Sequence, residues 1–182
     1  MAQVLLQNNR RASWILLLLS GLPILLGIAL YAWRGANPTI SSLLLILAIV
    51  LAIAGVILCF RQIAWLRNPR ISCTSDELLV YLKGFSPFRI PLDVVEVFFL
   101  GEGPSMVPAL NRQQVPSVTV VIRLAEKATE WHRRDTSKSL GHWCDGYIIV
   151  RGTWTEPLNK DVVGNMNSQL AALKRARKNP ST

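Results

Sequence analysis

Few side chains of this sequence could bind a metal ion. The soft or borderline ligands outside the most apolar part of the chain are Cys73, His132, His142 and Cys144. Only His142 and Cys144 are close in the chain, and their spacing is shorter than the ligand spacings of zinc sites. We therefore predict no metal site. We also predict no structural disulfide, because three cysteines without an obvious pairing are typical of a reducing cytoplasm.

Acid–base catalysis has equally few candidates. His132, Asp135 and His142 are the groups that could transfer protons. The stretch 101–105 reads Gly-Glu-Gly-Pro-Ser, which is neither a nucleophile elbow nor a phosphate-binding glycine loop. We predict a protein that is not an enzyme and has no cofactor. The alternative is an enzyme that acts on a membrane-embedded substrate with His132, Asp135 and His142.

Aromatic and basic side chains in two polar stretches are better candidates for contacts with a partner or a lipid. One group flanks a predicted hairpin turn near residue 85, and the other lies in the long polar connection 125–146. Long loops of this kind often carry the function that is specific to one protein. For Phe88 and Trp143 the competing interpretation is closure of the core. The candidate contacts are Lys83, Phe85, Phe88, Arg89, Trp131, Arg133 and Trp143.

The chain carries a net charge of +9 and has a pI near 10.1, which raises the question of nucleic-acid binding. Much of the excess charge follows from the position of the arginines, which flank long apolar runs. No aromatic–basic ribonucleoprotein motif occurs in the predicted strands. We therefore predict no nucleic-acid partner.

Two long uncharged runs must position the rest of the chain. Residues 12–33 and 39–60 contain no charged side chain, and each is long enough to cross a bilayer as a helix. The connection 34–38 is too short for a domain, so the two helices form a hairpin. A cleaved signal peptide is the alternative for the first run, which is longer than a signal core.

Arginines near these runs indicate the orientation of the hairpin. Arg10 and Arg11 precede the first run, cations at 61, 67 and 70 follow the second, and only Arg34 lies between them. By the positive-inside rule we predict an integral, two-span membrane protein with both termini in the cytoplasm. Small residues at 48, 52 and 55 would seat a neighbouring helix, most simply within the hairpin itself.

The remaining sequence predicts one folded domain. Residues 1–60 form the membrane hairpin, 61–70 a juxtamembrane linker, 71–178 a cytoplasmic domain and 179–182 a tail. Alternation and turn residues predict strands, and a helical period with Asn159 as N-cap predicts an amphipathic helix after them. The strands are expected over 77–83, 88–92, 94–100, 117–124 and 147–152, and the helix has Val162, Val163, Met166, Leu170 and Leu173 on its apolar face.

Two segments after the hairpin resemble a known family. Residues 72–84 read Ser-Cys-Thr-Ser-Asp-Glu-Leu-Leu-Val-Tyr-Leu-Lys-Gly, and 89–97 read Arg-Ile-Pro-Leu-Asp-Val-Val-Glu-Val. This pattern after two membrane helices resembles the bacterial pleckstrin-homology-like (PH-like) membrane proteins. The resemblance implies an α+β fold in which a PH-like antiparallel β-barrel or sheet is closed by the C-terminal helix. Segments 101–116 and 125–146 depart from the family pattern.

A fold of this kind with no catalytic constellation predicts a membrane-anchored, non-catalytic interaction or assembly module. Its partners would be the lipid bilayer and a membrane or cytoplasmic protein, and a homo-oligomer is a further option. The resemblance also implies a second reading, an anionic-lipid headgroup sensor, because lipid-binding members of the wider fold use basic residues in the hairpin that contains Lys83 and Arg89.

Overall fold

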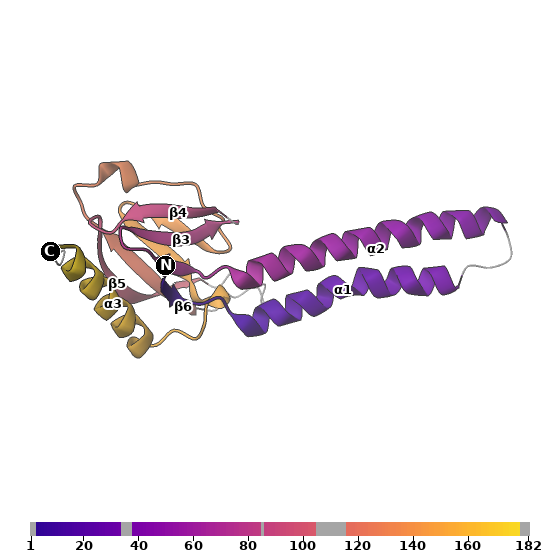
Figure 1. Ribbon diagram of the computed structural model, residues 1–182, viewed down its shortest axis with the longest axis horizontal. Helices are drawn as coiled ribbons and strands as arrows, with labels where there is room; N and C mark the ends of the chain where they lie inside the picture. The colour runs from indigo at the N-terminus through magenta and orange to yellow at the C-terminus, as the bar shows by residue number, and fades with distance from the viewer. Residues whose placement is uncertain (1–2, 34–37, 85, 105–115, 179–182) are drawn as a thin grey trace. The chain divides into compact units, whose positions relative to one another are not determined.

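The computed structural model describes residues 3–33, 38–84, 86–104 and 116–178. The chain folds into two units, one made of Arg10–Arg67 and the other of Met1–Asn9 together with Asn68–Thr182. The first unit consists of two helices, and the second combines two antiparallel sheets with a C-terminal helix (Figure 1). The α+β class predicted from the sequence is confirmed.

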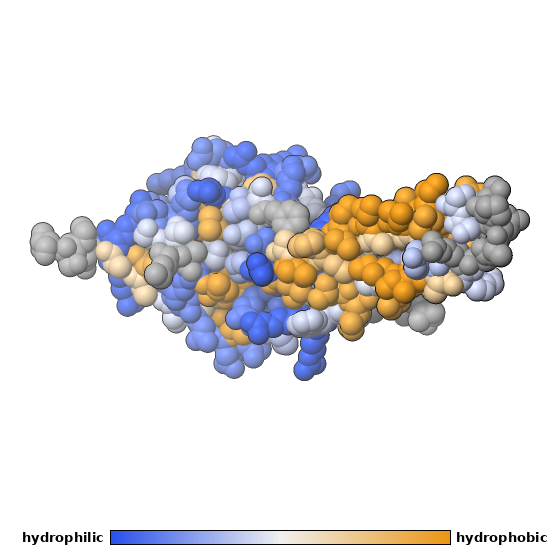
Figure 2. Space-filling view, turned by 45° about the vertical axis from the view of Figure 1, so that its right-hand side comes forward, coloured by the Kyte–Doolittle hydropathy of each residue, from blue (hydrophilic) through white to orange (hydrophobic). Residues whose placement is uncertain are grey.

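The two helices of the first unit are long and apolar. Helix α1 spans Arg10–Ala32 and helix α2 spans Pro38–Arg67. Both are long and apolar enough, by length and composition, to cross a membrane. Their outward surfaces are hydrophobic over most of their length (Figure 2). Helix α2 continues without a break to Arg67, where the sequence predicted a linker from residue 61.

Small residues line the contact between the two helices. The buried residues Ser20 and Gly27 of α1 face Cys59 and Ala48 of α2, and a Cβ atom on Gly27 would lie 2.8 Å from the carbonyl oxygen of Ala48. Gly55 of α2 lies against Ile24 in the same way. Close backbone approach of this kind is typical of membrane helix pairs. The prediction that the small residues of α2 serve the hairpin itself is confirmed.

The first sheet has the strand order β1-β2-β3-β4, and all its pairings are antiparallel. Its inner face is formed by alternate residues of β3, where Leu78, Val80 and Leu82 are fully buried. Gly84, with a φ of +62°, follows β3 at the predicted hairpin turn. The strands are β1 (Gln3–Leu6), β2 (Ile71–Cys73), β3 (Glu77–Lys83) and β4 (Ser86–Pro91).

The second sheet has the order β5-β6-β8-β7, again antiparallel throughout. Asp145 and Gly146 both have positive φ and form the tight turn between β7 and β8, as two-residue hairpin turns require. Phe98, Ile122 and Ile148 are buried on the inner face. The strands are β5 (Val95–Pro104), β6 (Pro116–Leu124), β7 (Gly141–Cys144) and β8 (Tyr147–Arg151).

The two sheets do not form the closed barrel that was one of the two expected forms. Among the described strands no ladder of hydrogen bonds joins one sheet to the other. Only single bonds connect them, such as that from the Ser137 amide, just before β7, to the Leu82 carbonyl of β3. Each sheet therefore keeps two edge strands, and exposed edge strands tend to pair with other chains. In this domain other parts of the chain cover these edges.

Helix α3, Lys160–Lys178, covers one pair of edges. It contacts β5 and β1, buries Val163, Met166 and Leu170, and lies along β5 in Figure 1. The Asn159 side chain accepts a hydrogen bond from the Val162 amide, which confirms the predicted N-cap. The Asn167 side chain accepts a hydrogen bond from the Phe98 amide at 2.9 Å and donates one to the Phe98 carbonyl at 2.8 Å, as a neighbouring strand would.

The strand β1 was not predicted, because four residues before a basic pair carry little pattern. Because of this strand, residues that precede the helical hairpin in the sequence belong to the same folded unit as residues that follow it. Beyond β1, Asn8 forms a β-bridge with Thr155 and the Asn9 amide donates to the Trp154 carbonyl. The buried Arg70 donates from Nε to the same Trp154 carbonyl, so residues before α1 and after α2 are held by one short segment.

Candidate interaction site

Three aromatic rings close the side of the sandwich that α3 leaves uncovered. Phe88 of β4 meets Trp143 of β7 edge to face, with ring centroids 5.3 Å apart. Trp143 in turn stacks on Trp131, with centroids 6.1 Å apart and an interplanar angle of 18°. The Trp143 indole N–H also donates to the Trp131 carbonyl. These contacts join the edge strand of each sheet to the loop that carries Trp131, and we call the three residues the aromatic stack.

The structure brings together three residues that the sequence predicts as separate contacts. Trp131 lies in a short 3₁₀ helix, Thr129–Trp131, inside the predicted long connection. Trp143 is buried, with 7% of its surface exposed, whereas Phe88 and Trp131 are partly exposed. The core-closure interpretation therefore applies to Trp143, and Trp131 forms the outer end of the stack.

Charged side chains surround the stack. The Arg134 guanidinium lies over the Trp131 ring, 5.1 Å from its centroid, and the Trp131 indole N–H donates to Glu130. Lys83 forms an ion pair with Asp135 at 3.3 Å, and Arg133 one with Asp145 at 3.7 Å. All four side chains of these pairs are more than half exposed, so the pairs are weak and can exchange for contacts with a partner.

Two of the proposed contacts stand apart from this arrangement. Arg89 pairs with Glu77 of the neighbouring strand β3 at 3.7 Å, which leaves it on the outer surface of the first sheet. Phe85 lies outside the described residues. Arg134 and Glu130 were missed by the sequence reasoning, although an arginine near a tryptophan in a polar loop is a signal for a cation–π contact.

Two of the candidate acid–base groups, Asp135 and His142, have other charged neighbours in the described structure. Asp135 is engaged by Lys83 rather than by a histidine. His142 precedes Trp143 in β7, so the alternation of the strand directs it to the opposite, outer face of the sheet. Burial and the nearby Arg151 charge lower the pKa of His142 below its usual value. The described residues contain no group of three metal-binding side chains.

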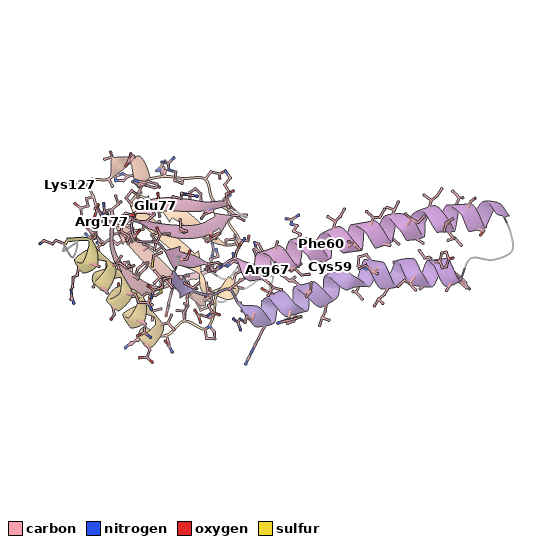
Figure 3. The ribbon with its side chains drawn as sticks, in the orientation of Figure 1. Cys59, Phe60, Arg67, Glu77, Lys127 and Arg177 are labelled. Atoms are coloured by element: carbon pink, nitrogen blue, oxygen red, sulfur yellow. The ribbon has the colours of Figure 1, made fainter. Side chains whose placement is uncertain are left out.

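A second charged surface lies where α3 ends beside the start of β5. The Lys174 ammonium donates to the Val95 carbonyl, and Arg177 pairs with Asp93 at 2.8 Å and Asp76 at 3.9 Å. Lys174, Arg177, Lys178 and Asp93 line a shallow, open pocket there. Figure 3 labels Arg177 on α3, near the end of the helix. Lys174 and Arg177 thus hold the helix against the segments that lead into β3 and β5.

Comparison of the chain with protein-family models, curated proteins and solved structures finds no match.

Proposed function

We propose that this protein is a membrane-anchored, non-catalytic interaction module whose cytoplasmic domain binds a protein partner at the outer end of the aromatic stack. The observation that carries the proposal is the stacking of Trp131 on Trp143, with Arg134 over it and exposed ion pairs around it. Tryptophan and arginine are the residues that contribute most to protein interfaces. A tryptophan supported from below by a buried ring is also rigid, which lowers the entropy lost on binding.

The membrane anchor is the helical hairpin. Its support is the length and hydropathy of α1 and α2 and their exposed apolar side chains, including Leu18, Leu25 and Ile57. The folded unit built from residues before α1 and after α2 supports a topology with both termini on one side, because β1 and β2 can pair only in the same compartment. The arginine bias makes that side the cytoplasm.

The PH-like assignment is also part of this proposal. It is supported by two antiparallel sheets of four strands each and a C-terminal helix that covers one pair of edges. In this arrangement the helix and the aromatic stack cover opposite edges of the sandwich. The partner would then bind at the edge that the helix leaves accessible.

The test is crosslinking of the full-length protein in its native membrane, followed by mass spectrometry. The double variant Trp131→Ala/Arg133→Ala should lose the crosslinks from residues 68–182 to a partner protein, while the chain stays folded by circular dichroism. The matched control is Phe99→Ala/Arg123→Ala, which removes a partly exposed ring and an ion-paired arginine from the second sheet.

The outcomes separate the alternatives. Crosslinks that persist in the Trp131→Ala/Arg133→Ala variant would show that the aromatic stack is not the contact. Crosslinks only to lipid, together with salt-sensitive binding of the protein to anionic liposomes, would support a headgroup sensor instead. Loss of cellular function in His132→Gln/His142→Gln, with the fold intact, would support an enzyme.

A further inference from the structure

The apolar segments of α1 and α2 are offset from each other along the long axis of the hairpin. Three contacts define their register: Ser20 Oγ lies 3.4 Å from Cys59 Sγ, Ile24 lies against Gly55, and Gly27 lies against Ala48 and Ala52. From Ser20 through Ile24 to Gly27, each step along α1 is matched by an equal step back along α2, from Cys59 through Gly55 to Ala52. Continued along both helices, this register places Phe60 beside Leu19.

The same register places two arginines of α2 at different heights on α1. Arg61 falls beside Leu18, well inside the apolar run of α1, whereas Arg67 falls beside Ala12, at the start of that run. Figure 3 shows the labelled Cys59 and Phe60 nearer to the tip of the hairpin than Arg67. The predicted spans 12–33 and 39–60 therefore cannot both begin at one membrane boundary.

The position of Arg61 sets the boundary on the side of the helix termini. Its side chain is exposed on α2, next to the exposed Phe60. An arginine exposed to lipid is costly in the hydrocarbon and extends toward the headgroups. The start of α1 then lies at headgroup level, where the exposed Trp14 ring is favourable.

The end of α1 sets the opposite boundary. The helix ends at Ala32, which the register places beside Leu47 of α2. Trp33 follows the helix as a turn residue, and non-helical backbone cannot be exposed to hydrocarbon. The next charged residue in the sequence is Arg34. The segment over which both helices are apolar therefore runs only from Leu19 to Ala32 on α1. These roughly 14 residues span about 21 Å at about 1.5 Å per residue.

We propose that the hairpin fits a bilayer considerably thinner than the usual hydrocarbon core of about 30 Å, and that its preferred lipid partners are phospholipids with short acyl chains. This inference rests on the proposed insertion of the hairpin into a membrane. Lipid acyl chains contact this part of the hairpin, because exposed leucine and isoleucine side chains cover both helices over this segment.

The test measures the relative affinity of the full-length protein for lipids of different chain length. The protein is reconstituted in mixtures of brominated and unbrominated phosphatidylcholines with dimyristoleoyl, dioleoyl or dierucoyl chains, and quenching of its tryptophan fluorescence is recorded. The strongest binding is expected for the dimyristoleoyl lipid. Arg61→Leu should shift the optimum to longer chains, because the common apolar segment then extends toward Arg67.

Arg67→Leu is the matched control, since it removes the same charge from the same helix outside the common apolar segment. Its optimum should remain that of the unchanged protein. An optimum at dioleoyl or longer chains in the unchanged protein, or the same optimum in Arg61→Leu, would overturn the inference while leaving membrane insertion intact. Absence of quenching by every brominated lipid would overturn insertion itself.

Discussion

His142 and Arg70 show how burial changes ionisation in this molecule. Arg70 is buried between β1 and the segment after β8, and burial lowers its pKa to about 10, so it remains a cation at neutral pH. Its Nε donates to the Trp154 carbonyl, and its own backbone amide donates to the Leu6 carbonyl. The charge is held by the interior of the domain and is not a surface cation available to an anionic partner.

For His142 we predict a pH-dependent contribution to stability. Its pKa in the folded chain is lowered, so between that pKa and the unfolded value near 6.5 the unfolded chain binds more protons. Stability should be highest above about pH 6.5 and should fall as the pH decreases through the folded pKa. Denaturant unfolding of the full chain in micelles, from about pH 8 to about pH 5, measures this. His142→Gln should flatten the dependence, and an unchanged slope in that variant would contradict the assignment.

The edge of β5 depends on a single side chain of α3. Asn167→Ala removes both hydrogen bonds to the Phe98 backbone, and we expect a loss of about 1–3 kcal/mol in the free energy of unfolding because two partly buried backbone groups lose their partners. Asn165→Ala is the control, since Asn165 is exposed on the same helix. Hydrogen exchange at the Phe98 amide should be faster in the Asn167→Ala variant than in the control, and equal or slower exchange would contradict the prediction.

The close contact between α1 and α2 at Gly27 predicts that a larger residue there destabilises the hairpin. Gly27→Ala places a Cβ atom 2.8 Å from the Ala48 carbonyl oxygen, so the helices must separate, and we expect a loss of about 1–3 kcal/mol in the stability of the hairpin. Gly21→Ala is the matched control, because nothing lies within 4 Å of its added atom. The measurement is unfolding in mixed micelles by increasing detergent denaturant. Equal stability of the two variants would disprove the close contact.

Patterns within one element could be read from the sequence, and contacts between elements could not. The boundaries of β3 follow from the alternation of Leu78, Val80 and Leu82, and the start of α3 follows from Asn159. The register of the hairpin depends on which small residues meet, and an apolar run does not encode that. The stacking of Trp131 on Trp143 required the fold of the connection between them, which carries no period.

At the scale of the whole chain, the folded domain depends on residues before the hairpin. Leu6 in β1 is fully buried, and Leu6→Ala should cost about 2–5 kcal/mol in the stability of the sheet domain, although the substitution lies before both helices. Val4→Ala in the same strand is the control, since Val4 is 47% exposed. Hydrogen exchange at β2 and β3 in the full chain would report the difference. Equal protection in both variants would show that β1 is dispensable.

The pairing of β1 with β2 has a consequence for biosynthesis. Gln3–Leu6 leaves the ribosome before either helix, and its partner Ile71–Cys73 follows only after both helices have been made. In a membrane-inserted chain, a helix that failed to cross would leave the two strands in different compartments. The sheet domain could then not assemble, and its exposed edge would be open to proteases. Folding of this domain would therefore act as a quality check on the insertion of the hairpin.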